Sequence, residues 1–329
     1  MRLAAFLACL LPALACATPA TPYAERDDVR SFIVEMQEKH GLDNEPLEQL
    51  FAHTRPIPAV LKAVAPPSDP GIRSWQSYRQ RFIEPRRIKA GLEFWQHHAA
   101  PLAKASAQSG VPPEFIVAII GIETLYGKQL GRFGTFAALA TLAFDYPPRA
   151  DLFRRELEAL LLLARDERRA PDSYRGSFAG AIGLPQFLPS SIRAYAVDFD
   201  RNGHIDLTTS PPDAIGSVAN FLKAHGWEQD GPVTIKVDAD RTASQPLIDE
   251  GIRPARRPEE MRSFGVTLPA ETPDAPAALI DLVTPDRATE YWLGYQNFFV
   301  ITRYNRSSFY AMSVFQFAEV LRAQRERLK

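Results

Sequence analysis

The sequence predicts a mainly α-helical protein with a small inserted subdomain that contains β-strands. Three observations support this fold class. Apolar residues recur at helix spacing through most of the chain, most clearly in residues 150–167. The alternation typical of strands is confined to residues 229–290. The last segment, residues 291–329, begins with aromatic residues and returns to a helical pattern, so we expect it to pack back on the helical core.

Residues 1–17 have the pattern of a secretory signal peptide, with an early arginine, a short apolar run and small residues. The apolar run is too short to span a bilayer, and no other segment is long and apolar enough. Both cysteines, Cys9 and Cys16, fall inside this segment, so the mature chain is expected to form no internal disulfide. Cleavage after "ACA" would give a soluble periplasmic protein. Cleavage before Cys16 would give a lipoprotein, although Ala13 stands where a leucine is usual.

Residues 18–70 are expected to form an N-terminal helical segment and a linker. A helix is predicted over 25–52, and a short one ends in the proline-rich stretch "IPAVLKAVAPPSDPG". The apolar positions that recur at helix spacing in the first of these are Val29, Phe32, Ile33 and Met36.

Residues 71–228 are expected to form the helical core. A helical run covers about 72–108, and the next helix opens at Pro112 and Pro113, which are tolerated in a first turn. Another helix covers 213–224 and stops before a glycine.

The later part of the chain alternates between strands and helix. The stretches "GPVTIKVDAD" and "AALIDLVT" in residues 229–290 are predicted to be strands, and a final helix is predicted from about Ser307. Its apolar face comprises Tyr310, Val314, Phe317 and Leu321.

The overall charge excludes one class of partner. The 329 residues carry 38 basic and 39 acidic side chains, and 46% are hydrophobic. A chain of this length and composition can bury a sizeable core, but it lacks the basic excess of a nucleic-acid-binding protein.

One acidic residue lies in an apolar run. In "AIIGIETLYGKQLGRFGT", Glu123 shares a helix face with Ile116, Ile119 and Ile120, and the helix is expected to end at Gly127. Burial and the negative end of the helix dipole would both raise the pKa of this carboxyl group. A carboxylic acid that stays protonated near neutral pH can act as a general acid. The alternative is that Glu123 points outward or pairs with a nearby Lys128 or Arg132.

A glycine-rich stretch follows at residues 174–203, "YRGSFAGAIGLPQFLPSSIRAYAVDFDRNG". It matches neither the phosphate loop nor the dinucleotide motif. Small residues around Ser177 and Gln186 suit a polar, neutral ligand such as a sugar, whereas the alternative is a tight structural crossing of the backbone.

The stretch "DFDRNGHIDLTT" has the first half of a calcium loop. Asp198, Asp200 and Asn202 have the expected spacing, and the glycine stands at the sixth position. His204 would contribute its backbone carbonyl. Thr209 occupies the twelfth position, where a glutamate is usual, so Asp213 is the nearest candidate for the missing ligand. The alternative is a turn without metal.

Several of these motifs occur together in one known family. The stretches "GIETLYGKQLGRFGTFAALATLAFDYPPRADLFRRELEALLLLARDE", "GSFAGAIGLPQFLPSSIRAYAVDFDRNGHIDL", "DAIGSVANFLKAHGW" and "RYNRSS" resemble the membrane-bound lytic murein transglycosylase B family. The similarity runs in order from about Tyr78 to the C-terminus and is weakest over 230–290. It implies a lysozyme-like catalytic core at 71–228 with an EF-hand-like calcium loop.

The resemblance also implies an activity and its residues. Family members cleave the MurNAc–GlcNAc β-1,4 bond of peptidoglycan and leave a 1,6-anhydromuramic end. Glu123 is similar to their single catalytic acid/base. The residues that match the family's substrate-binding positions are Tyr78, Ser177, Gln186, Tyr304 and Asn305. The residues that match its calcium ligands are Asp198, Asp200, Asn202, His204 and Asp213.

The same resemblance sets expectations about cofactors, partners and location. No cofactor is required for the chemistry, and a structural Ca²⁺ is expected at the loop. The expected partners are peptidoglycan glycan strands and cell-wall synthesis proteins, with no nucleic acid. The expected location is the periplasm, with membrane contact only through a lipid on Cys16. One departure is that the family's "NYFKAHGW" reads "NFLKAHGW" here, so Phe221 lacks a hydroxyl group. The stretch before Asp213 is also one residue longer.

Two alternatives to this activity stay open from the sequence. One is a muramidase-type hydrolase, which would add water to the cleaved bond. The other is a non-catalytic peptidoglycan-binding protein. Because Asp145, Asp151 and Asp166 lie in polar or surface contexts, the sequence favours a single acid assisted by the substrate's N-acetyl group over a carboxylate pair.

Overall fold

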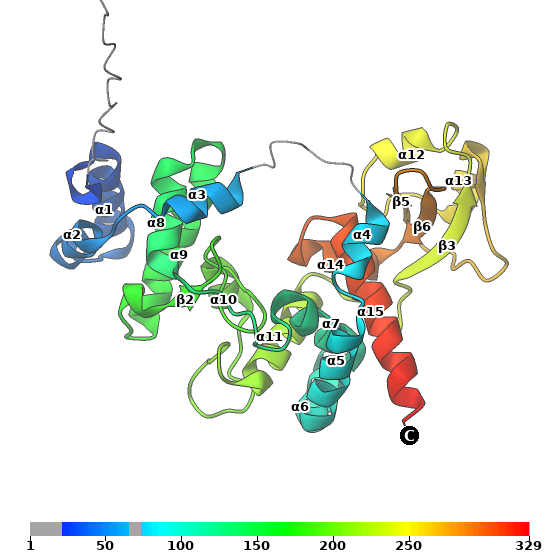
Figure 1. Cartoon of the computed structure of the whole chain (residues 1–329), viewed down its shortest axis with the longest axis horizontal. Coiled ribbons are helices and arrows are strands. Elements are labelled where there is room, and N and C mark those ends of the chain that lie inside the picture. The colour runs from blue at the N-terminus through cyan, green and yellow to red at the C-terminus, as the bar shows by residue number, and fades with distance from the viewer. Residues whose placement is uncertain (1–21, 66–73, 329) are drawn as a thin grey trace, which may run out of the picture. The chain divides into compact units, whose positions relative to one another are not determined.

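The computed structural model describes residues 22–65 and 74–328, and the chain divides into two compact units, Met1–Arg55 and Pro56–Lys329 (Figure 1). The expected signal peptide at 1–17, with Cys16, lies outside the described residues, as do residues 66–70 of the expected linker.

The described part of the first unit, residues 22–55, contains three short helical elements, η1 (Tyr23–Glu25), α1 (Asp27–His40) and α2 (Asn44–His53). The four apolar positions predicted to share a helix face are all buried. The single helix predicted over 25–52 is nevertheless two helices, because Gly41 ends α1 in the left-handed conformation with φ 64°.

The second unit carries the remaining elements. Its α-helices are α3 (Pro58–Val64), α4 (Trp75–Gln80), α5 (Pro85–His97), α6 (Ala99–Ser109), α7 (Pro113–Thr124), α8 (Thr135–Asp145), α9 (Ala150–Asp166), α10 (Pro189–Tyr195), α11 (Pro211–Ala224), α12 (Gln245–Asp249), α13 (Pro258–Met261), α14 (Gln296–Tyr304) and α15 (Ser308–Glu326). Its 3-10 helices are η2 (Pro147–Arg149), η3 (Pro171–Ser173) and η4 (Arg262–Phe264). The prediction of a mainly helical fold is confirmed.

The helical run predicted over 72–108 is three helices. Helix α4 ends at Gln80. Glu84 starts α5, because its side chain accepts hydrogen bonds from the backbone N–H groups of Arg86 and Arg87 and Pro85 follows at the first helical position. His98, with φ −115° and ψ 31°, then separates α5 from α6.

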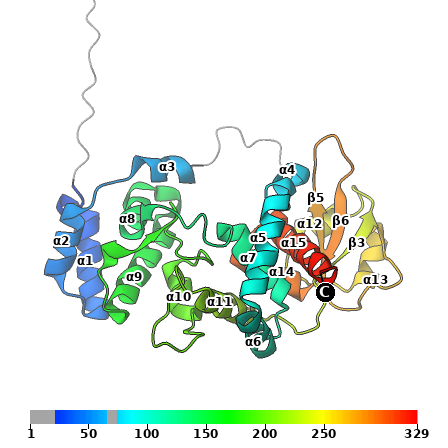
Figure 2. The same cartoon turned by 60° about the horizontal axis from the view of Figure 1, so that its bottom comes forward.

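Helix α7 is apolar on all sides, and such a helix is stable in water only when protein surrounds it. It packs against α5, α6, α11 and α15. Figures 1 and 2 both show α5, α7 and α15 side by side. The helix therefore carries its last turn, which contains Glu123, to the interior of the second unit.

A second group of helices holds the glycine-rich loop. Helix α9 packs against α8 and α10, and α10 contacts α11. The two-residue strands β1 (Phe133–Gly134) and β2 (Arg175–Gly176) pair antiparallel and join the start of α8 to the start of the loop.

The inserted subdomain is a four-stranded antiparallel sheet in the order β4-β3-β6-β5. Its strands are β3 (Thr234–Ala239), β4 (Val266–Thr267), β5 (Ala278–Leu282) and β6 (Glu290–Gly294). Both predicted strands are present, as β3 and β5. Strand β6, which was not predicted, lies between them and extends past residue 290. The subdomain has its own buried apolar cluster, which includes Val237, Leu279 and Leu293.

The C-terminal segment returns to the helical core. The Ser307 hydroxyl oxygen accepts a hydrogen bond from the Tyr310 N–H, so α15 begins where the sequence predicted. It packs against α5, α7 and α14. Within residues 22–65 and 74–328, no single helix is long and apolar enough to cross a membrane, and only α6 and α7 together, with a 115° bend between them, meet the length and hydropathy criteria.

Candidate active site

Glu123 lies in the last turn of α7. Its predicted neighbours Ile116, Ile119 and Ile120 are fully buried. The helix ends at Thr124 rather than at Gly127, because Leu125 and Tyr126 adopt left-handed conformations with φ 49° and 58°. Positive φ is uncommon in residues other than glycine, and such conformations cluster at functional sites.

The Thr124 side chain explains the early end of the helix. Its hydroxyl donates to the carbonyl oxygen of Leu184 at 3.0 Å and accepts from the N–H of Gly127 at 3.1 Å. The side chain therefore fixes the turn after the helix and ties it to the glycine-rich loop. Glu123 is held one residue before this junction.

The Glu123 carboxyl group has one hydrogen-bonding partner among the described residues. The Tyr310 hydroxyl donates to its Oε1 atom at 2.6 Å. Burial raises the pKa of Glu123 to about 7, and the Tyr310 hydrogen bond offsets part of that rise. In the described part of the chain, neither Lys128 nor Arg132 forms an ion pair with it.

Two further tyrosines lie close to the acid. The Tyr304 ring stacks on the Tyr310 ring, with centroids 6.3 Å apart and planes 14° apart, and its hydroxyl donates to the carbonyl oxygen of Pro185 at 2.6 Å. Burial and then the charge of Glu123 raise the pKa of Tyr304 and of Tyr78. Tyr78 and Tyr304, both predicted from the sequence, are thus brought to the same carboxyl group.

The glycine-rich loop holds its two predicted polar residues differently. The Ser177 hydroxyl oxygen accepts hydrogen bonds from the N–H groups of Ala179 and Ala181, at 3.2 and 3.1 Å. Gln186 has a φ of 50°, and its side-chain amide donates to the carbonyl oxygens of Leu130 and Gly183. Gln186 therefore organises the loop, whereas the Ser177 hydroxyl proton has no acceptor among the described residues.

Asn305 ends α14 in an extended conformation and is exposed. Its backbone carbonyl accepts from the N–H of Ser307, and among described residues its side chain makes no hydrogen bond. The amide is therefore free to contact a ligand near Tyr304.

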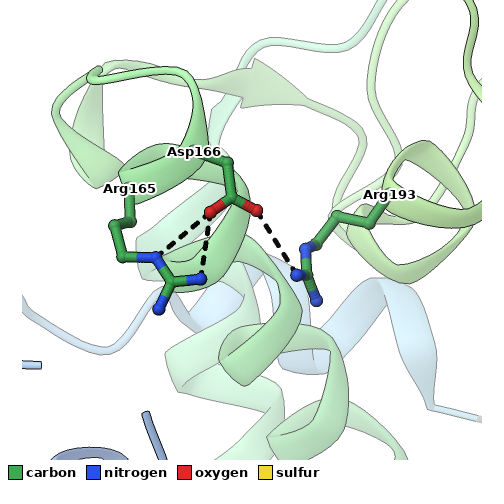
Figure 3. Close-up of polar contacts among 3 residues, drawn as sticks. All are labelled: Arg165, Asp166 and Arg193. Atoms are coloured by element: carbon green, nitrogen blue, oxygen red, sulfur yellow. Dashed lines mark hydrogen bonds and ion pairs between the residues drawn. The ribbon is translucent and has the colours of Figure 1, made fainter. Parts of the chain in front are cut away.

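The acidic residues considered as a second carboxylate do not join Glu123. Asp166 is bound by Arg165 and Arg193 at the surface, as Figure 3 shows. Burial raises the pKa of Asp166, but the hydrogen bonds and charges of the two arginines together outweigh burial and lower it. Asp151 is exposed in the first turn of α9. No other acid among the described residues perturbs the pKa of Glu123.

The predicted metal ligands are partly brought together. One carboxylate oxygen each from Asp198, Asp200 and Asp213 lies within 4.8 Å of the others. The Asn202 side chain accepts from the N–H of His204, and the Asn202 N–H donates to Asp198 and Asp200. Such a set of oxygen atoms suits Ca²⁺, which takes six to eight oxygen ligands.

Asp213 fixes this loop from outside it. The residue is fully buried, and its two carboxylate oxygens accept from the N–H groups of Phe199 and Asp206, at 2.8 and 2.9 Å. The longer stretch before Asp213 thus still allows its carboxylate to reach the loop.

Comparison with known proteins identifies the chain. A family model described as "Transglycosylase SLT domain" matches residues 24–319. The chain belongs to this transglycosylase family.

Relatives of this transglycosylase support the assignment over most of its length. It is 39% identical over 308 residues to the membrane-bound lytic murein transglycosylase B of Escherichia coli (strain K12), which covers 91% of this chain and 84% of the relative. The soluble lytic transglycosylase SltB1 of Pseudomonas aeruginosa is 43% identical, with a TM-score of 0.84 over 91% of this chain and 99% of the other. The Escherichia coli lytic transglycosylase Slt35, solved in complex with calcium, is 38% identical, with a TM-score of 0.78 over 93% and 94%. These relatives confirm the lysozyme-like fold.

The transglycosylase has one site residue that sequence reasoning missed. Tyr310 was assigned only to the apolar face of the last helix, yet it is the hydrogen-bond donor to Glu123. A signal was available, because a buried tyrosine hydroxyl needs a polar partner and Val314, Phe317 and Leu321 on the same face offer none.

Phe221, which stands where the family has a tyrosine, lies next to the site. Its buried ring contacts Tyr304, Phe187 and Tyr195, with ring centroids 4.9, 5.5 and 5.0 Å apart. It also packs against the His225 ring, with centroids 4.1 Å apart and the ring planes tilted by 31°. Phe221 therefore supports Tyr304 by packing alone.

Proposed function

We propose that the chain is a lytic transglycosylase that cleaves the MurNAc–GlcNAc β-1,4 bond of peptidoglycan and leaves a 1,6-anhydroMurNAc end. The observation that carries this proposal is Glu123, whose pKa of about 7 lets it hold a proton and release it near neutral pH. Membership of the transglycosylase family and the relative named for murein both support it.

In the first step, protonated Glu123 donates its proton to the glycosidic oxygen as the C1–O bond breaks. The carbonyl oxygen of the substrate's own N-acetyl group stabilises the electron-poor C1 centre, as in substrate-assisted glycosidases. This role needs no second carboxylate. It agrees with the lack of another acid near Glu123 among the described residues.

In the second step, ionised Glu123 takes the proton of the muramyl C6 hydroxyl, and the C6 oxygen attacks C1. The N-acetyl oxygen leaves C1, the 1,6-anhydro ring closes and Glu123 is again protonated. Tyr310 stabilises the ionised carboxylate between the two steps through its 2.6 Å hydrogen bond.

The other site residues orient the sugar. Ser177 donates its free hydroxyl proton to the N-acetyl carbonyl, and its two backbone donors increase the polarity of that hydroxyl. Asn305 binds the same group, Tyr78 and Tyr304 position the ring, and Gln186 holds the loop in place.

A structural Ca²⁺ at the Asp198 loop braces this part of the chain in our proposal. The three clustered carboxylates support the site, and a solved relative holds calcium. The backbone carbonyl of His204 and the side chain of Asn202 complete the ligands. The ion has no part in the chemistry, because the loop serves to position α11 and its neighbours.

We also propose a periplasmic location, where the substrate lies. An outer-membrane anchor depends on a lipid at Cys16, and the proposed partners are glycan strands and cell-wall synthesis proteins. The name of the Escherichia coli relative supports membrane attachment.

The test is product analysis of digested peptidoglycan. Wild-type protein is expected to release anhydromuropeptides, and Glu123→Gln to lose activity by several powers of ten, because each acid–base step contributes about 10²–10⁴. Products heavier by one water would indicate a hydrolase. Binding without release would indicate a non-catalytic protein.

A further inference from the structure

Tyr126 has an unusual backbone conformation close to the acid. It is the second of two consecutive residues with positive φ, 49° at Leu125 and 58° at Tyr126, and it follows Glu123 by three positions. Neither residue is a glycine, so this turn costs free energy that the surrounding contacts must offset. The Thr124 hydrogen bonds hold the turn to the glycine-rich loop. The contacts of the Tyr126 ring hold it to a different element, α5.

The Tyr126 ring lies between α5 and α7. It stacks on the Phe94 ring of α5, with centroids 5.0 Å apart and planes 29° apart. Its hydroxyl oxygen lies where two glycines leave room. A Cβ atom on Gly91 of α5 would lie 2.5 Å from this oxygen, and a Cβ atom on Gly121 of α7 would lie 2.3 Å from it. Glycine destabilises a helix interior relative to alanine, so these two positions give up helix stability and make room for the ring.

The Tyr126 hydroxyl contributes shape rather than chemistry. Its oxygen is buried and has no hydrogen-bonding partner among the described residues. Burial raises the pKa of Tyr126, and the charge of Arg87 offsets only part of that rise, so the hydroxyl stays protonated near neutral pH. A buried hydroxyl without a partner does not stabilise the fold. It fills the space between Gly91 and Gly121 and thereby fixes the position of the ring.

The ring is linked to the acid through both the backbone and α15. Gly121 precedes Glu123 by two residues and Tyr126 follows it by three, so the ring contacts α7 beside the turn that it belongs to. A Cβ atom on Gly121 would also lie 3.0 Å from the Phe317 ring of α15, the helix that carries Tyr310. Displacement of the Tyr126 ring would therefore move the last turn of α7 relative to α15 and lengthen the 2.6 Å hydrogen bond to Glu123.

We propose that Tyr126 is a positioning residue for Glu123. Its ring, held between Gly91 and Gly121, fixes the left-handed turn after α7 and thereby the place of the catalytic carboxyl group. The effect on rate rests on the proposed function, whereas the effect on the place of Glu123 follows from the packing alone. The proposal predicts that activity depends on the space available to the ring and not on the hydroxyl group as such.

The test uses substitutions that differ in how closely they approach the ring. In Gly91→Ala the new methyl group would lie 2.5 Å from the Tyr126 hydroxyl oxygen and 3.3 Å from the ring carbon that bears it. Tyr126→Phe removes the oxygen, so the ring fits again. In Gly121→Ala the same ring carbon would lie at 2.6 Å, so Tyr126→Phe does not make enough room. Both Gly91 variants keep a contact of 2.7 Å with a Leu321 methyl group, so this contact cancels between them.

Initial rates on soluble peptidoglycan strands give kcat and KM separately. Gly91→Ala and Gly121→Ala should each lose about tenfold to a hundredfold in kcat with KM within about twofold, because the acid moves and the sugar contacts stay. Adding Tyr126→Phe should return Gly91→Ala to within about threefold of wild type and leave Gly121→Ala low. Tyr126→Phe alone should keep the wild-type kcat. Rescue of both glycine variants, rescue of neither, or a loss of kcat in Tyr126→Phe alone overturns the proposal.

Two further variants separate positioning from general destabilisation. In Gly294→Ala the new methyl group would lie 2.7 Å from the Phe298 ring, a clash of the same kind at the end of β6. This control should lower Tm, because overpacking destabilises, and should keep the wild-type kcat. A similar loss of kcat in the control would overturn the proposal. Tyr126→Leu removes the ring without adding a clash and decides the question if the glycine variants do not fold. It should lose kcat as they do, and wild-type kcat in it would refute the role of the ring.

Crystal structures of the variants give a readout that does not depend on activity. In Gly91→Ala the distance between the Tyr310 hydroxyl and the Glu123 carboxyl group should exceed about 3.5 Å, beyond hydrogen-bonding range. Adding Tyr126→Phe should restore the 2.6 Å contact. If wild type releases no product, the proposed function fails, and the structures still decide whether the ring places the acid. A carboxyl group that stays in place in both Gly91→Ala and Gly121→Ala would refute the positioning role.

Discussion

Replacing Glu123 by Gln is expected to stabilise the second unit at alkaline pH while abolishing activity. The pKa of Glu123 rises from its ordinary value of 4.5 to about 7 in the folded chain. At about 1.4 kcal/mol per pH unit, the folded chain loses about 3 kcal/mol relative to the unfolded chain when this group ionises. Glutamine cannot ionise, and its carbonyl oxygen still accepts the Tyr310 hydrogen bond.

The sign of the effect follows from proton binding. Below about pH 4 both states hold the proton, so wild type and variant are equally stable. Between the ordinary and the raised pKa the folded state binds more protons than the unfolded state, so wild-type stability falls as pH rises. Above about pH 7 the full difference of about 3 kcal/mol separates the two proteins.

Urea unfolding followed by tryptophan fluorescence measures this difference. The four tryptophans, Trp75, Trp95, Trp227 and Trp292, all belong to the second unit, so their signal reports the unit that contains Glu123. Other titrating groups cancel between the two proteins. Stability profiles that run parallel from about pH 4 to about pH 8 would show that burial does not raise this pKa, and the reasoning would be refuted.

Three further experiments test the site. Tyr310→Phe should lower kcat by about tenfold or more, since a hydrogen bond to a charged group contributes about 1.5–3 kcal/mol. It should also move the alkaline limb of the pH–rate profile to higher pH, because the Tyr310 hydrogen bond lowers the pKa of Glu123 in the wild type. A limb that stays in place would contradict that role. Ser177→Ala should lower Tm, because the N–H groups of Ala179 and Ala181 lose their acceptor, and should lower kcat/KM beyond what Gly203→Ala in the calcium loop causes. Unchanged kcat/KM would exclude Ser177 from the site. Calcium at about 100 times its Kd should stabilise wild type by about 2.7 kcal/mol and leave Asp198→Asn with Asp200→Asn unaffected, as calorimetry with and without a chelator measures. Equal Tm values for wild type with and without calcium would refute the proposed metal site.

The sequence predicted those parts of the fold that depend on local pattern. Helices α9, α11 and α15 and strands β3 and β5 follow from periodicity and from their start and stop residues. The sequence missed β6 and α14, because their aromatic residues show neither clear alternation nor clear helix spacing. Strand β6 forms because β3 and β5 lie on either side of it.

The site residues that belong to specific motifs were predictable. Contacts between residues far apart in the sequence were not. Glu123 was predictable as a site residue because an acid among isoleucines on one helix face is unusual. The end of its helix was misplaced at Gly127, because the Thr124 hydrogen bond to Leu184 joins residues 60 positions apart. Tyr310 acts on Glu123 across 187 positions, a distance at which spacing rules carry no information.

Tyr310 and Tyr304 lie near the C-terminus but bind Glu123 and Pro185, which are synthesised much earlier. This order bears on when cell-wall lysis can begin. A chain still being synthesised has its proton donor, Glu123, long before it has Tyr304 and Tyr310, which complete the surroundings of that carboxyl group. A prematurely terminated product would carry the glutamate without its hydroxyl partner. The site is therefore complete only after synthesis of the C-terminal helices has finished. This order delays an activity that would damage the envelope of the cell that makes the protein.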